Sequence, residues 1–182
     1  MLDIPFKDLQ KDMRDAYVGG GTGVLASSIV WFVSGIVAIY ATKEMSILTF
    51  FLGGMLIYPL GMVSTKLFNR TGKHQKNNPL AFLAFESTII LFIGLFMAYA
   101  IFQIEKQWFF PVMLMIIGAR YLVFQSIYGM KIYWLLGLLL TASGIICLIS
   151  NQPFQIGGIA GGVVEVIFGG LIIQLDRKSN QS

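Results

Sequence analysis

Long apolar stretches separated by short polar segments make up most of this chain. Six of the stretches approach or exceed the roughly 20 residues that an α-helix needs to cross the hydrocarbon core of a bilayer. We place these predicted spans at residues 20–41, 46–67, 80–102, 109–127, 133–150 and 154–175. The pattern therefore predicts an all-α integral membrane protein with six transmembrane helices.

The segment before the first span has a different pattern. Apolar residues recur at helical spacing, with charged residues around them: Phe6, Leu9, Met13 and Tyr17. This pattern predicts a short amphipathic helix on the cytoplasmic membrane surface. The expected organisation is a surface helix in 1–18, a transmembrane domain in 19–176 and a short cytoplasmic tail in 177–182. Because the glycine cluster at 19–23 lacks the Lys-Ser/Thr of a phosphate-binding loop, we interpret it as a joint.

The amino-acid composition supports a membrane protein and argues against a soluble domain and a metal-dependent enzyme. The chain is 56% hydrophobic and only 12% charged, whereas a soluble domain has roughly 25% charged residues. A single cysteine excludes an intramolecular disulfide, and a single histidine leaves zinc catalysis and histidine-based triads without their ligands and bases. We therefore expect no metal, no cofactor and no enzymatic activity.

The basic residues alternate between the two ends of the spans, which predicts the orientation of the chain. Basic residues that precede the first span, fall in the second and fourth loops or follow the last span are Lys7, Lys11, Arg14, Lys66, Arg70, Lys73, Lys76, Lys131, Arg177 and Lys178. The other side has only Lys43 and Lys106. The positive-inside rule then places both termini in the cytoplasm. The net charge of +4 is explained by orientation, so we expect a lipid bilayer as partner and no nucleic acid.

Three charged residues lie inside predicted spans: Glu86, Arg120 and Glu165. A charge at bilayer depth costs roughly 2.5–3.5 kcal/mol on insertion scales, so it persists where it is paired, hydrated or functional. At 1.5 Å per residue, all three lie roughly 10–15 Å from the cytoplasmic ends of their helices. We therefore predict one shared polar site. Its other candidate residues are Tyr58, Tyr121, Ser27, Ser28 and Trp31.

Two interpretations of this site stay open. In the first, Glu86, Arg120 and Glu165 form a buried ion network that only holds helices together, as in a structural or stress-related membrane protein. In the second, they line a pocket that is open to the cytoplasm and binds or transports a small solute or a proton. Since two acids surround one base, we expect one glutamate to be protonated much of the time.

Glycines suggest how the helices pack. Gly158, Gly162 and Gly169 share one helix face with Glu165, and small residues at this spacing let helices approach closely in membranes. We therefore predict that this face, with Glu165, points toward protein, whether in packing within the chain, in a homo-oligomer, or in both. Similar motifs at the outer ends of the first, third and fifth spans suggest three tandem helical hairpins.

Two stretches resemble known families. The last hairpin, residues 134–174, with its turn Asn151-Gln152-Pro153, resembles the repeat of HdeD-type acid-resistance membrane proteins, which also have six spans. The opening, Asp12-Met-Arg-Asp-Ala-Tyr17 followed by Gly19-Gly20-Gly21-Thr22-Gly23 and Trp31, resembles a family of small bacterial multispanning proteins of unknown function. These resemblances imply a multi-pass fold in a bacterial inner membrane, and they imply no activity.

Overall fold

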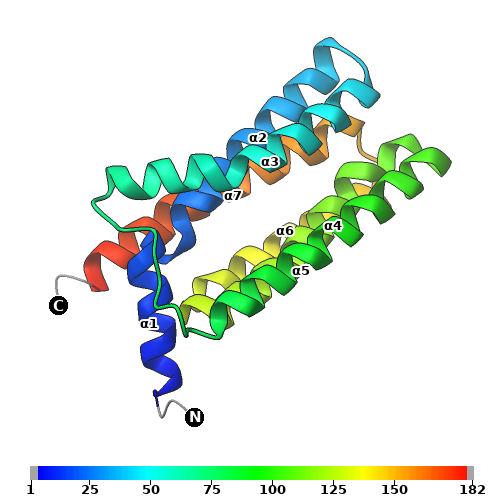
Figure 1. The fold of residues 1–182 in the computed structure, drawn as a ribbon. Helices are drawn as coiled ribbons and strands as arrows, with labels where there is room; N and C mark the ends of the chain where they lie inside the picture. Colours follow the sequence, from blue (N-terminus) through cyan, green and yellow to red (C-terminus); the bar gives the residue numbers. More distant parts are fainter. Residues whose placement is uncertain (1–3, 180–182) are drawn as a thin grey trace.

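The computed structural model describes residues 4–179, and every regular element in this range is helical (Figure 1). The parts of the predicted surface helix and tail at 1–3 and 180–182 lie outside the described residues. The elements are α1 (Phe6–Tyr17), η1 (Val18–Gly20), α2 (Gly21–Tyr40), α3 (Lys43–Leu67), α4 (Leu80–Ile104), η2 (Lys106–Trp108), α5 (Phe109–Tyr128), α6 (Ile132–Ile149) and α7 (Phe154–Ser179).

The six predicted spans correspond to helices α2 to α7. Six helical segments of the described chain are long and apolar enough to cross a membrane, which fits a multi-pass membrane protein. Helix α7 continues beyond the predicted span, which ends at residue 175, as far as Ser179. Arg177 and Lys178 lie in its last turn, where positive charge interacts favourably with the helix dipole.

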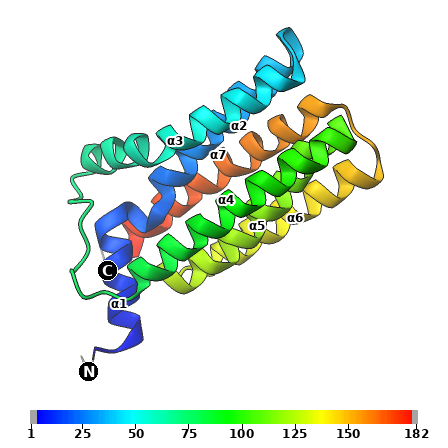
Figure 2. The ribbon, with the colours of Figure 1, turned by 45° about the vertical axis from the view of Figure 1, so that its right-hand side comes forward.

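The six long helices are arranged as an open ring. Neighbours pack in the order α3, α2, α7, α6, α5, α4, whereas α3 and α4, at the two ends of this order, make no extensive contact. Figures 1 and 2 show α2, α3 and α7 in one group and α4, α5 and α6 in the other. Consecutive helices pack as pairs, as three hairpins would require, but a repeat relation between the pairs stays a prediction.

The most extensive helix contact joins α2 to α7, although they are far apart in the sequence. A Cβ atom added to Gly158 would lie 2.9 Å from the Cα of Gly35, and one added to Gly162 would lie 2.7 Å from the Phe32 ring. Glycine thus permits a backbone approach that no other residue allows. The prediction that the face with Gly158, Gly162 and Glu165 points into the protein is confirmed.

The glycine cluster forms a tight joint between α1 and α2. Val18, Gly19 and Gly20 have positive φ angles of 54°, 61° and 82°. The Tyr133 hydroxyl donates a hydrogen bond to the carbonyl oxygen of Gly19 at 2.6 Å. A Cβ atom on Gly20 would lie 2.6 Å from the same hydroxyl. Backbone conformation and close packing therefore both require glycine at Gly20.

Helix α1, which precedes this joint in the chain, lies across one end of the bundle (Figure 1). The Gln10 side chain donates to the carbonyl oxygen of Ser126 at the end of α5, at 2.8 Å. Asn78, in the loop between α3 and α4, donates to the carbonyl oxygen of Leu9 at 2.9 Å and to the Asp12 carboxylate at 2.7 Å. Helix α1 and the last turns of α7 lie toward this end of the bundle, and the side of the membrane that this end faces stays a prediction.

Candidate functional site

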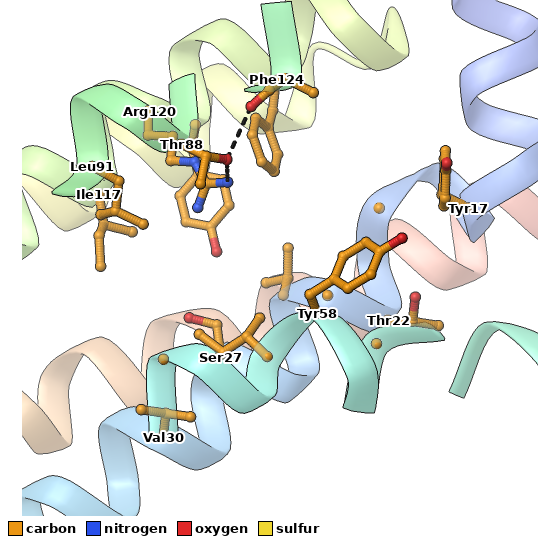
Figure 3. A pocket seen from close by; sticks show the side chains of 18 of the residues that line it. Tyr17, Thr22, Ser27, Val30, Tyr58, Thr88, Leu91, Ile117, Arg120 and Phe124 are labelled. Atoms are coloured by element: carbon orange, nitrogen blue, oxygen red, sulfur yellow. Dashed lines mark hydrogen bonds between the residues drawn. The ribbon is translucent and has the colours of Figure 1, made fainter. Parts of the chain in front are cut away.

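A pocket of about 540 Å³ lies inside the open ring, between the α2–α3 wall and the α4–α5 wall. Figure 3 shows Ser27, Val30 and Tyr58 on one side of this space and Thr88 and Arg120 on the other. Its volume is within the range of small-molecule sites, roughly 300–1,000 Å³. Most lining side chains are apolar, and a few polar groups converge among them.

The pocket has a polar end and an apolar end. At the end near α1, the polar lining residues include Tyr17, Thr22, Thr65 and His74. Toward the middle of the helices the lining becomes apolar, with residues such as Val30, Phe50, Phe92, Leu95 and Met113. Arg120 lies between these two regions, at the level of Thr88, and it donates a hydrogen bond to the Thr88 hydroxyl.

Arg120 is the charged residue of the pocket lining. Its Nη2 donates to the Thr88 hydroxyl at 3.0 Å, its Nε donates to the Ser87 hydroxyl at 3.4 Å, and its Cζ lies 5.0 Å from the centre of the Phe124 ring. Among residues 4–179, no acidic side chain forms an ion pair with it. These direct partners are neutral. Glu165 acts on the guanidinium electrostatically but lies beyond ion-pair distance, so no anion within residues 4–179 is in direct contact with this half-buried positive charge.

The predicted ion network among Glu86, Arg120 and Glu165 is therefore not formed. Glu86 is exposed on the outer side of α4, and no ion pair involves it in the described part of the chain. Successive residues of a helix are rotated by about 100°. Because Ser87 and Thr88 face Arg120 on α5, Glu86 points away from it.

Glu165 lies behind the pocket wall and is fully buried, with 0% of its surface exposed. The Tyr121 hydroxyl donates to its Oε1 at 2.8 Å, and Ser27 and Trp31 also lie near this carboxyl. The structure thus brings together four of the predicted site residues. Tyr121 and Ser27 also line the pocket, so they connect the buried acid to the pocket surface.

The remaining candidates have other surroundings. Trp31 is buried, and its ring centre lies 4.7 Å from that of Phe50. Ser28 donates to the carbonyl oxygen of Leu25 in its own helix. Tyr58 lines the pocket and is 72% exposed.

Tyr17 and His74 were not among the predicted site residues. The Tyr17 hydroxyl and the His74 Nδ1 are 2.7 Å apart, and both side chains line the polar end of the pocket. This hydrogen bond joins α1 to the loop between α3 and α4. Nothing in the local sequence indicates that α1 and this loop meet. The contact between Tyr17 and His74 depends on the direction that the joint at residues 18–20 gives to α1.

The pocket opens sideways, between α3 and α4. Several lining side chains along this opening are themselves exposed, among them Met55 and Tyr58 on α3 and Phe85 and Phe92 on α4. We call this opening the seam. The seam lies between the unpacked edges of α3 and α4, whereas α1 and the α3–α4 loop lie across one end of the bundle. An opening of the pocket to the cytoplasm stays a prediction.

Comparison with known proteins places the chain in a family. A model described as a family of unknown function, DUF7010, matches residues 6–175. The chain belongs to this family. Membership agrees with the uncharacterised family predicted from the opening residues, and it supplies no activity. No curated protein and no solved structure matches the chain.

Proposed function

We propose that this protein binds a small molecule with an anionic group inside the membrane, in the pocket between the α2–α3 and α4–α5 walls. The observation that carries the proposal is Arg120, a cation in a largely apolar pocket whose partners in the described chain are two hydroxyls and an aromatic ring. A guanidinium in such surroundings favours a carboxylate or phosphate ligand, with which it forms charge-assisted hydrogen bonds.

Several finer expectations belong to this proposal. The protein is a multi-pass protein of a bacterial inner membrane with both termini cytoplasmic, and it transports its ligand or holds it without catalysing a reaction. The resemblance of the last hairpin to HdeD-type proteins is compatible with a stress-related role. Homo-oligomers stay an open expectation.

One observation favours the alternative of a purely structural polar site. Glu165 is fully buried with Tyr121, Ser27 and Trp31 near it, as expected of a group that holds helices together. This interpretation accounts for Glu165. It leaves Arg120 without an acidic side chain at ion-pair distance among residues 4–179, since Glu165 acts on it only from farther away.

The test compares benzoate with benzyl alcohol, a neutral molecule of similar shape, in thermal unfolding of the purified protein in a non-ionic detergent. We expect benzoate to raise the Tm of the wild type more than benzyl alcohol does, because ligand binding stabilises the folded state. Arg120→Gln, which keeps hydrogen-bond donors and removes the charge, abolishes this difference. Lys66→Gln, which changes an exposed lysine outside the pocket, preserves it. Equal benzoate effects in wild type and Arg120→Gln would contradict the proposal.

A further inference from the structure

The pocket has a large apolar region on one side of Arg120, which a site for a small water-soluble anion does not need. Polar groups surround the end near α1, Arg120 occupies the middle, and the part beyond Arg120 is apolar. Along α4, the lining extends from Thr88, level with Arg120, to Leu95. Seven residues of helix correspond to about 10 Å. A ligand that fills this space has an anionic group at one end and an apolar chain at the other.

The position of the opening supports the same ligand class. The seam faces sideways, where six membrane-spanning helices would meet lipid, and its edges carry apolar side chains such as Met55 and Phe92, each 53% exposed. An ion dissolved in water would have to cross this apolar border. A single-chain amphiphile already lies in the bilayer with its chain among apolar groups and its head near the membrane surface.

We infer that the ligand is a single-chain amphiphile with a carboxylate head, that is, a fatty-acid-like molecule. Its head lies at Arg120 with Tyr58 and Thr88 beside it, and its chain extends past Val30 and Phe92 toward Leu95, with any excess length emerging at the seam. This inference rests on the proposed function, because it assigns the ligand class of the same pocket.

One glycine allows the chain-binding part to be tested without disturbing the fold. Gly54 lines the pocket from α3, and a Cβ atom added there would meet no atom within 4 Å. Gly54→Leu therefore places a side chain in or beside the space meant for the ligand without a clash at Cβ. Gly170→Leu is the matched control, since a Cβ there also meets nothing within 4 Å and Gly170 lies outside the pocket lining.

The experiment measures equilibrium binding of radiolabelled decanoate to the protein in phosphatidylcholine nanodiscs, with uptake by empty nanodiscs subtracted. Butyrate has the same head and a short chain, and decanol has the same chain and no charge. We expect decanoate to bind at least tenfold more tightly than either. Arg120→Gln and Gly54→Leu each reduce decanoate binding at least tenfold, while Gly170→Leu leaves it unchanged. The Tm of each variant shows that it is folded.

The outcomes separate the two proposals. If butyrate and decanoate bind equally well and both depend on Arg120, the pocket takes water-soluble anions, so the amphiphile inference fails and the proposed function stands. If decanol binds as tightly as decanoate, the head does not contribute and both proposals fail. Decanoate binding that is unchanged in folded Gly54→Leu would also overturn the assignment of the chain to this pocket.

Discussion

At the scale of residues, Arg120 and Glu165 show two ways of keeping a polar group inside a membrane protein. Arg120 bonds to hydroxyls and lies over the Phe124 ring, and a partly desolvated cation–π contact contributes about 1–2 kcal/mol. Glu165 is fully buried and accepts a hydrogen bond from Tyr121. The first group faces a pocket and the second is enclosed by protein, so we expect substitutions at the two sites to affect different properties.

Tyr121→Phe is predicted to lower the free energy of unfolding by about 1–3 kcal/mol, because it removes a hydrogen-bond donor from the buried Glu165 carboxyl. The measurement is thermal or denaturant unfolding in detergent. Tyr58→Phe is the matched control, since the Tyr58 side chain is 72% exposed and its hydroxyl forms no hydrogen bond within residues 4–179. The prediction is wrong if both variants are equally stable.

The depth of these residues could be predicted from the sequence, but their rotation about the helix axis could be predicted only in part. On α7, the glycine stripe shows which face is buried, so the orientation of Glu165 was predicted correctly. On α4, the small residues Ala84, Ser87, Gly94 and Ala98 recur at helical spacing, and the last three are buried. Glu86 lies about 100° away from this face. The expected pairing of Glu86 with Arg120 failed because it was based on depth and charge and not on this stripe.

At the scale of elements, glycine determines how closely the helices approach. On α5, a Cβ atom added to Gly118 would lie 2.7 Å from the carbonyl oxygen of Gly137 and 3.0 Å from the backbone nitrogen of Thr141 on α6. Backbone atoms cannot move aside as a flexible side chain can, so this contact fixes the spacing of α5 and α6. Helix α5 belongs to one wall of the pocket, and α6 packs against the other side of α5.

We predict that Gly118→Ala destabilises the protein by about 1–3 kcal/mol, the usual cost of excess volume in a packed interior. Gly170→Ala is expected to be neutral or slightly stabilising, because its Cβ has open space around it and alanine favours the helix. Unfolding of both variants under the same conditions checks this prediction. A Gly118→Ala protein as stable as the wild type would show that α5 and α6 can separate without cost.

At the scale of the whole molecule, the open ring determines where a ligand can enter. A closed ring of six helices would expose its interior only at the two membrane surfaces. In this ring α3 and α4 do not pack together, so the interior communicates with the side of the molecule. The spans themselves follow from hydropathy, but the order of the helices around the ring does not. Apolar faces of similar composition could pair in several ways, and long-range packing selects one.

The even number of spans and the distribution of basic residues predict that both termini are cytoplasmic. Tags attached to the two ends should both be digested by protease in inside-out vesicles and both be protected in right-side-out vesicles. A periplasmic control protein with the opposite pattern verifies vesicle orientation. Tags digested on opposite sides would mean that one of the six helices does not cross the membrane.

The contact between α2 and α7 has a consequence for biosynthesis. During translation the four helices α3 to α6 are made between α2 and α7, yet α2 and α7 share the most extensive interface in the bundle. The face of α2 with Phe32 and Gly35 therefore lacks its partner until these four helices and α7 have been made. A product that ends between Ile149 and Phe154 would retain helices α2 to α6 and lack α7, which completes the packing of α2. Premature termination anywhere before α7 should thus yield a protein that membrane quality control can recognise.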